Sequence, residues 1–175
     1  LGLSRYLRAD YAAATRAYQS IPTSGAFAND ESLAATAHWH YMALRRSGVS
    51  AREASQAALS LIHPGMRALD GGAYLRLTLF YKGLAPQPAL DGNATALDLA
   101  TLGYGVANFH WYNGRRDDAI ALWQRVVNTT YWAAFGFIAS EAELFRLGVE
   151  QPHGPAAASA RAPPLALRRS SPTVA

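Results

Sequence analysis

The sequence has no cysteine, which excludes disulfide scaffolds, thiolate metal sites, iron–sulfur clusters and cysteine nucleophiles. No apolar run approaches the roughly 18 residues that a membrane-spanning helix needs, so we expect no integral membrane segment. Lysine is nearly absent, since Lys82 is the only one among 16 basic residues. Acidic residues are absent after Glu150, so the last 25 residues carry +3 of the net charge of +4. The remaining chain shows no basic stripe, and we expect no nucleic-acid binding.

The sequence is rich in alanine and arginine, and its apolar residues recur with helical periodicity. The 175 residues include 36 alanines and 15 arginines, a composition typical of a GC-rich bacterial genome. The length suits one domain with a sizeable core. A helical pattern is already running at Leu1 and no signal segment is visible, so we interpret the chain as a fragment or a processed form. Localisation in a bacterial cytoplasm or periplasm therefore stays open, as does the oligomeric state.

Apolar residues recur at helical spacing and strand-like alternation is almost absent, which predicts an all-α protein without a β-sheet. Asn29 is the expected cap of one helix, and Ser50 with Glu53 forms a capping box at the start of the next. Pro86 and Pro88 leave room only for a short, irregular helical piece. The expected main helices are 11–20, 30–46, 51–62, 73–82, 97–112, 117–127 and 131–147.

Small and aromatic residues recur at fixed intervals along these helices. Ala14 is followed four residues later by Tyr18, and Ala119 is followed in the same way by Trp123. Leu1-Gly2 supplies a Leu-Gly pair, and the closing segment carries Trp132, Phe135 and Gly136. This spacing resembles the tetratricopeptide repeat, whose pattern is W-x2-L-G-x2-Y followed by A-x3-F. The sequence departs from that pattern at Ala107 and His110, which stand where the family has Gly and Tyr.

The resemblance implies antiparallel helix pairs stacked as a right-handed superhelix. Residues 1–148 would form this repeat domain, with a truncated first repeat. Residues 149–175 would form a disordered tail, because from Gln151 onward they are rich in Pro, Ala and Arg and lack an apolar period. An irregular helical bundle with coincidental Ala and Gly spacing is the alternative architecture. We expect Gly136 and Ala119 to lie at close helix crossings, where only small residues fit.

No catalytic or cofactor motif is present, so we expect a protein that is not an enzyme and that binds neither metal nor cofactor. His38 and His40 are the most suggestive pair of titratable residues. On one helix they are about 200° apart and cannot share a metal ion. We expect one of them at the surface or in a groove and the other facing the core or a helix interface. An enzyme of unfamiliar type that uses His38 or His110 with a nearby acid stays a less favoured alternative.

Tetratricopeptide domains usually bind ligands on the concave face formed by their first helices, and the resemblance assigns two residue triplets to that face. The expected groove residues are His38, Met42, Arg45, Tyr104, Asn108 and Trp111. Within each triplet the spacing i, i+4, i+7 places the residues on one side of a helix. Arginine, asparagine and aromatic side chains suit an extended peptide. The expected function is therefore a scaffold for a protein or peptide partner, with a small-molecule- or lipid-binding helical domain as the alternative.

Overall fold

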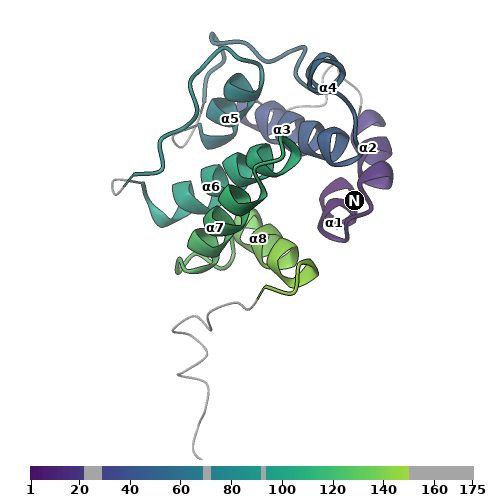
Figure 1. Cartoon of the computed structure of the whole chain (residues 1–175). Coiled ribbons are helices and arrows are strands. Elements are labelled where there is room, and N and C mark those ends of the chain that lie inside the picture. Colours follow the sequence, from purple (N-terminus) through teal and green to yellow (C-terminus); the bar gives the residue numbers. More distant parts are fainter. Residues whose placement is uncertain (22–28, 69–71, 92–93, 150–175) are drawn as a thin grey trace, which may run out of the picture.

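The computed structural model describes residues 1–21, 29–68, 72–91 and 94–149, and within these residues the chain is all-helical without a strand. Figure 1 shows the eight helices of this part of the chain. They are α1 (Gly2–Leu7), α2 (Tyr11–Gln19), α3 (Asp30–Arg46), α4 (Ala51–Ala58), α5 (Ala73–Tyr81), α6 (Ala96–Tyr112), α7 (Arg116–Val127) and α8 (Phe135–Arg146). The predicted fold class, all-α, is confirmed for the described residues.

Helix starts follow the caps that the sequence predicts. The side chain of Asn29 accepts a hydrogen bond from the backbone N–H of Ser32 at 2.8 Å and begins α3. The hydroxyl of Ser50 accepts from the N–H of Glu53 at 3.2 Å and begins α4. Such side chains satisfy N–H groups that the first helical turn leaves without partners.

Three segments differ from the prediction. The last helix begins at Phe135 and not at Tyr131, because Ala134 has an extended backbone that fixes the helix start there. Helix α4 ends at Ala58 instead of residue 62. Residues 84–91 hold no helix, since Pro86 and Pro88 remove backbone donors and restrict the chain on both sides.

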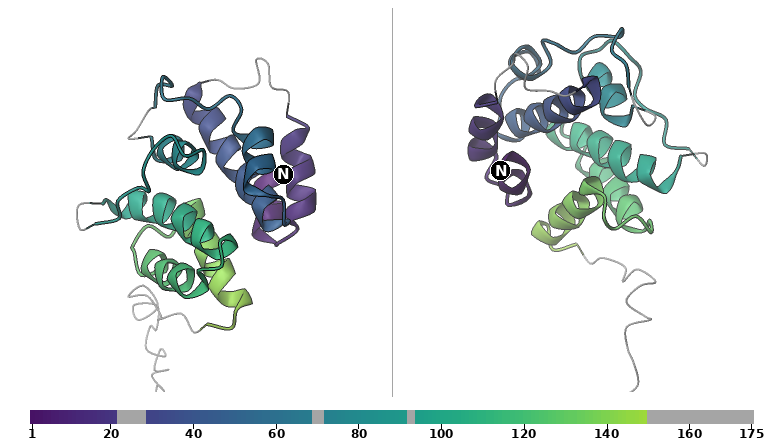
Figure 2. Two further views of the ribbon diagram at one scale, coloured as in Figure 1. Left: turned by 45° about the horizontal axis from the view of Figure 1, so that its top comes forward. Right: turned by 180° about the vertical axis from the view of Figure 1, so that it is seen from behind.

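The helices form one continuous array. Successive helices pack against each other from α1 to α4 and from α5 to α8, and α3 also packs on α5 and α6. Helix α8 packs on both α6 and α7. The array bends so that α8 returns beside α1, where the guanidinium of Arg146 donates to the carbonyl of Leu7 at 2.9 Å (Figure 2). The two ends of the described chain are thus held together.

Glycine allows the closest helix crossing. A Cβ atom added at Gly136 of α8 would lie 2.1 Å from the carbonyl oxygen of Ala100 in α6, a distance that no side chain can occupy. A Cβ atom added at Gly2 of α1 would lie 2.7 Å from Cζ in the ring of Tyr18. Ala119 is completely buried. The predicted close crossing at Gly136 is confirmed, and Ala119 is buried as a crossing residue must be.

The predicted tail lies outside the described residues, apart from Val149, which still packs against the core. Among the described helices, none combines the length and the apolar character that a membrane span requires.

Candidate functional site

The six predicted groove residues do not line an open surface together. His38, Met42, Tyr104 and Asn108 are each at most 1% exposed, and they fill the interior between α3 and α6. Arg45 and Trp111 are partly exposed. The face predicted to be concave and open is therefore occupied by the chain's own side chains.

The expectation that Arg45, Asn108 and Trp111 are all partly exposed towards one cavity is wrong for Asn108, which is completely buried. Arg45 does not reach it: its Nη1 donates to the carbonyl of Val49 at 2.7 Å, and its guanidinium lies over the ring of Tyr112. Arg46 takes the inward place instead, because consecutive residues of a helix differ by about 100° in direction.

Arg46 is the centre of a buried polar cluster, which we define as Tyr11, Arg46, Asn108, Glu143 and Arg146. Nη2 of Arg46 donates to Glu143 at 2.8 Å and to the hydroxyl of Tyr11 at 2.6 Å. Its Nη1 donates to Oδ1 of Asn108 at 3.1 Å. Arg146 pairs with the other oxygen of Glu143 at 2.8 Å. The cluster joins α2, α3, α6 and α8, and the sequence did not single out Arg46 or the inward role of Glu143.

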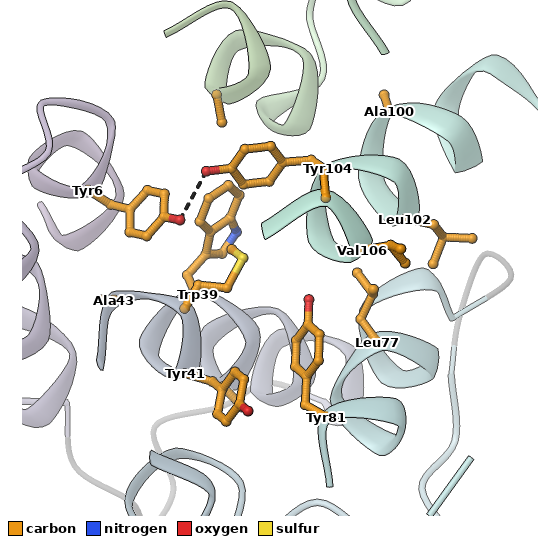
Figure 3. Packing of buried hydrophobic residues seen from close by; sticks show 14 of the residues in the cluster. Tyr6, Trp39, Tyr41, Ala43, Leu77, Tyr81, Ala100, Leu102, Tyr104 and Val106 are labelled. Atoms are coloured by element: carbon orange, nitrogen blue, oxygen red, sulfur yellow. Dashed lines mark hydrogen bonds between the residues drawn. The ribbon is translucent and has the colours of Figure 1, made fainter. Parts of the chain in front are cut away.

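Aromatic rings pack beside this cluster. Figure 3 shows Tyr6 of α1, Trp39 of α3 and Tyr104 of α6 converging, with the two tyrosine hydroxyls hydrogen-bonded at 3.0 Å. Burial raises the pKa of Tyr6 and of Tyr104 well above the ordinary value. These hydroxyls stay protonated and serve packing and hydrogen bonding, because a phenolate would not be stable at this depth.

Within the described residues, no group of three or more His, Asp or Glu side chains is placed to hold a metal ion. Both His38 and His40 are buried, so neither lies at the open surface. His40 lines a small pocket with Tyr18 and Leu61, which is the groove position that the expectation allowed for one of the two. His38 Nδ1 lies 3.3 Å from the hydroxyl of Tyr81, and burial lowers the pKa of His38 to about 3. His38 is therefore a neutral core residue at physiological pH.

Several large apolar side chains are exposed on α8 and on the turn before it. We define the α8 stripe as Trp132, Phe135, Ile138, Ala142 and Phe145. Phe145 is 81% exposed and Trp132 is 72% exposed. Within the helix, residues 135, 138, 142 and 145 follow the spacing i, i+3, i+7, i+10, so they form one continuous face. The opposite face of α8, with Gly136, packs on α6 and α7.

Exposure of the apolar side chains of the α8 stripe to water is unfavourable, and no described helix covers them. Folded monomers rarely expose several large apolar side chains side by side unless another molecule binds there. Tryptophan and phenylalanine are also the residue types that anchor protein interfaces. The sequence analysis assigned Trp132 and Phe135 to the repeat pattern and did not predict that they are exposed. The helical spacing of Phe135 with Ile138 and Phe145 was the signal that could have identified this face.

Comparison with known proteins identifies no relative: no family model matches the sequence, and no curated protein or solved structure is significantly similar to it.

Proposed function

We propose that this protein is a non-enzymatic helical scaffold of the tetratricopeptide-like type, and that it binds an amphipathic helix of a partner protein on the α8 stripe. The observation that carries the proposal is the continuous row of exposed Phe135, Ile138 and Phe145 along one helix. Such a row is the complement of a helix with apolar residues at i, i+3, i+4 and i+7.

The packing of the other helices supports a helical occupant. In the proposed repeat register α1, α3, α5, α6 and α8 are first helices. Helices α1, α3 and α6 are covered by the helices that follow them, α2, α4 and α7. Helix α5 is followed by residues 84–91, which hold no helix. Helix α8 follows the same order, but no described helix packs on its outer face. A partner helix on the α8 stripe would continue the stacking that the rest of the array already uses.

The interior is not part of the proposed surface. The buried polar cluster and the rings of Tyr6, Trp39 and Tyr104 fill the place where an open concave groove was expected. Binding on the α8 stripe needs no opening of this interior.

A photocrosslinking experiment in the native host tests the proposal. A photoreactive phenylalanine analogue is placed at Ile138 and, as a matched control, at the exposed Gln56 of α4. We expect crosslinks from position 138 only, and mass spectrometry should map them to an amphipathic helical segment of another protein. Crosslinks only to a second copy of the chain, or equal crosslinking from both positions, would contradict a partner helix.

Two substitutions make the same test quantitative. Phe135→Ser and Phe145→Ser should each weaken the crosslinked complex by about 2 kcal/mol, or roughly thirtyfold, if these rings are interface anchors. Because both rings are exposed, the free energy of unfolding should change by less than about 0.5 kcal/mol. A loss of folded protein would instead show that the rings stabilise the fold.

A further inference from the structure

A cleft of about 570 Å³ lies between α6, α7 and the non-helical segment of residues 87–90. In the proposed repeat register this segment stands where a second helix would cover α5. The prolines prevent that helix, and the chain is thinner than the helix it replaces (Figure 1). Nη2 of Arg125 donates to the carbonyl of Leu90 at 2.9 Å and fixes the segment in place. The cleft volume lies in the range of small-molecule sites, about 300–1,000 Å³.

One wall of the cleft comes from α7 and carries charges of both signs. Arg115, Asp118 and Arg125 line it from one side of the helix and just before its start, and the side chain of Leu122 lies between the charges. In the part of the chain that the structure describes, Arg115 makes no ion pair and its guanidinium is exposed. The wall therefore offers a planar cation with five donors beside an apolar patch.

His110 of α6 lines the cleft beside Arg115, whose backbone N–H donates to the carbonyl of His110 at 3.0 Å. The side chain of His110 is only 8% exposed, and its Nδ1 has no hydrogen-bond partner among the described residues. Burial, and then the charge of Arg115, lower the pKa of His110, so the ring is neutral at physiological pH. Leaving a buried nitrogen without a partner is unfavourable, and its presence at a cleft favours a site where another molecule completes the hydrogen bond.

We propose that this cleft binds a small monocarboxylate with an apolar body. Arg115 would hold the carboxylate through paired N–H donors, the ring of His110 would bond to the same head group, and Leu122 with the exposed Ala121 would contact the body. Asp118 stands on the same wall and repels a second negative charge, which disfavours dicarboxylates and phosphate. The site is independent of the α8 stripe and goes beyond partner binding.

Titration of the full chain with benzoate, followed by amide and imidazole NMR shifts, tests the site. We expect saturable shifts at Arg115, Asp118 and His110, with weaker saturation or none by succinate and by inorganic phosphate. Absence of saturable shifts with benzoate at millimolar concentration would overturn the proposal. Equal or tighter binding of phosphate would overturn its carboxylate and apolar-body commitments.

Variants separate the site from general charge effects. Arg115→Gln should weaken benzoate about tenfold or more, since a hydrogen bond to a charged group typically contributes about 1.5–3 kcal/mol. Arg52→Gln, an exposed arginine of α4 far along the chain, should leave the affinity unchanged. An equal loss in both variants would show nonspecific ion attraction. Phe145→Ser should keep benzoate binding, so the result is distinguishable from failure of the partner-helix proposal.

Discussion

The interior between α1, α3 and α6 and the outer face of α8 are both aromatic, yet only the interior rings have partners. Tyr6 lies 5.2 Å from Trp39 and 6.5 Å from Tyr104 between ring centroids, and each pair is edge-to-face. Phe135 and Phe145 on α8 are instead more than half exposed. Burying large rings stabilises a fold, whereas exposing them does not. The interior rings contribute to the stability of the fold, and the exposed α8 rings belong to the surface on which we propose that a partner binds.

The arginines repeat the same contrast. Arg46 has an ion pair, an amide oxygen and a hydroxyl as hydrogen-bond partners, and its side chain is 9% exposed. Arg115 at the cleft is exposed and has none of these partners in the described chain. A buried guanidinium must have its donors satisfied by the protein, while an exposed one stays available for a ligand. Removing the hydrogen-bond and ion-pair partners of Arg46 should therefore lower the free energy of unfolding, whereas Arg115 has no such partners in the described chain to lose.

The largest effect is expected at the buried polar cluster. Glu143→Ala removes the carboxylate that pairs with Arg46 and Arg146 and leaves Arg46 buried without an opposite charge. We expect a loss of about 3–5 kcal/mol in the free energy of unfolding, measured with denaturant. Arg76→Ala breaks the exposed pair with Asp98 and should cost at most about 1 kcal/mol. Similar losses in both variants would show that the buried ion pair of Glu143 contributes no more to stability than the exposed pair of Arg76 and Asp98.

A second effect depends on pH. Burial lowers the pKa of His38 from 6.5 to about 3, so only the unfolded chain takes up this proton between those values. The stability contributed by the neutral ring is complete above pH 6.5 and is lost as the pH falls. Between pH 7.5 and 4.5 the loss should be about 2–3 kcal/mol.

Denaturant unfolding of wild type and His38→Gln at both pH values isolates this contribution. The variant should lose less stability on acidification than the wild type, while His63→Gln, on an exposed turn, should behave as the wild type does. An unchanged pH dependence in His38→Gln would contradict the buried neutral histidine.

The smallest expected effect comes from placing leucine at two alanines, Ala119 in the interior and Ala142 on the α8 stripe. Ala119→Leu places a larger side chain in a completely buried position and should cost about 1–3 kcal/mol. Ala142→Leu adds the same atoms to the α8 stripe at a partly exposed position and should change the free energy of unfolding by less than about 0.5 kcal/mol. Thermal or denaturant melts of the pair measure the difference. Equal costs would mean that Ala119 is not at a tight crossing or that the α8 stripe is already covered.

Local features of the fold were predictable because they depend on neighbouring residues. The caps at Asn29 and Ser50 act within one helical turn, and the turn at Asn113-Gly114 ends α6 where the sequence indicates. The start of α8 was wrong, because Trp132 matches the repeat pattern and yet lies in the preceding turn. No local signal distinguishes a residue of the first helical turn from one just before it.

The candidate site was less predictable than the fold. Helical spacing correctly groups residues that share a face, such as Tyr104 and Asn108, but it does not show whether that face is open. Their burial results from the return of α8 towards α1, which brings Glu143 to Arg46 across 97 residues of sequence. The same spacing on α8 describes a face that is exposed.

The sequence by itself determined most of the helices, the caps at Asn29 and Ser50 and the small residue at which α8 crosses α6, because these depend on backbone hydrogen bonding and on side-chain volume within a few residues. Only the tertiary structure decided which faces are filled and which are free. Closure of the array buries Arg46, Asn108 and Glu143 together, and it leaves the α8 stripe and the cleft at Arg115 outside. Burial is a property of how distant segments meet, and no single helix carries that information.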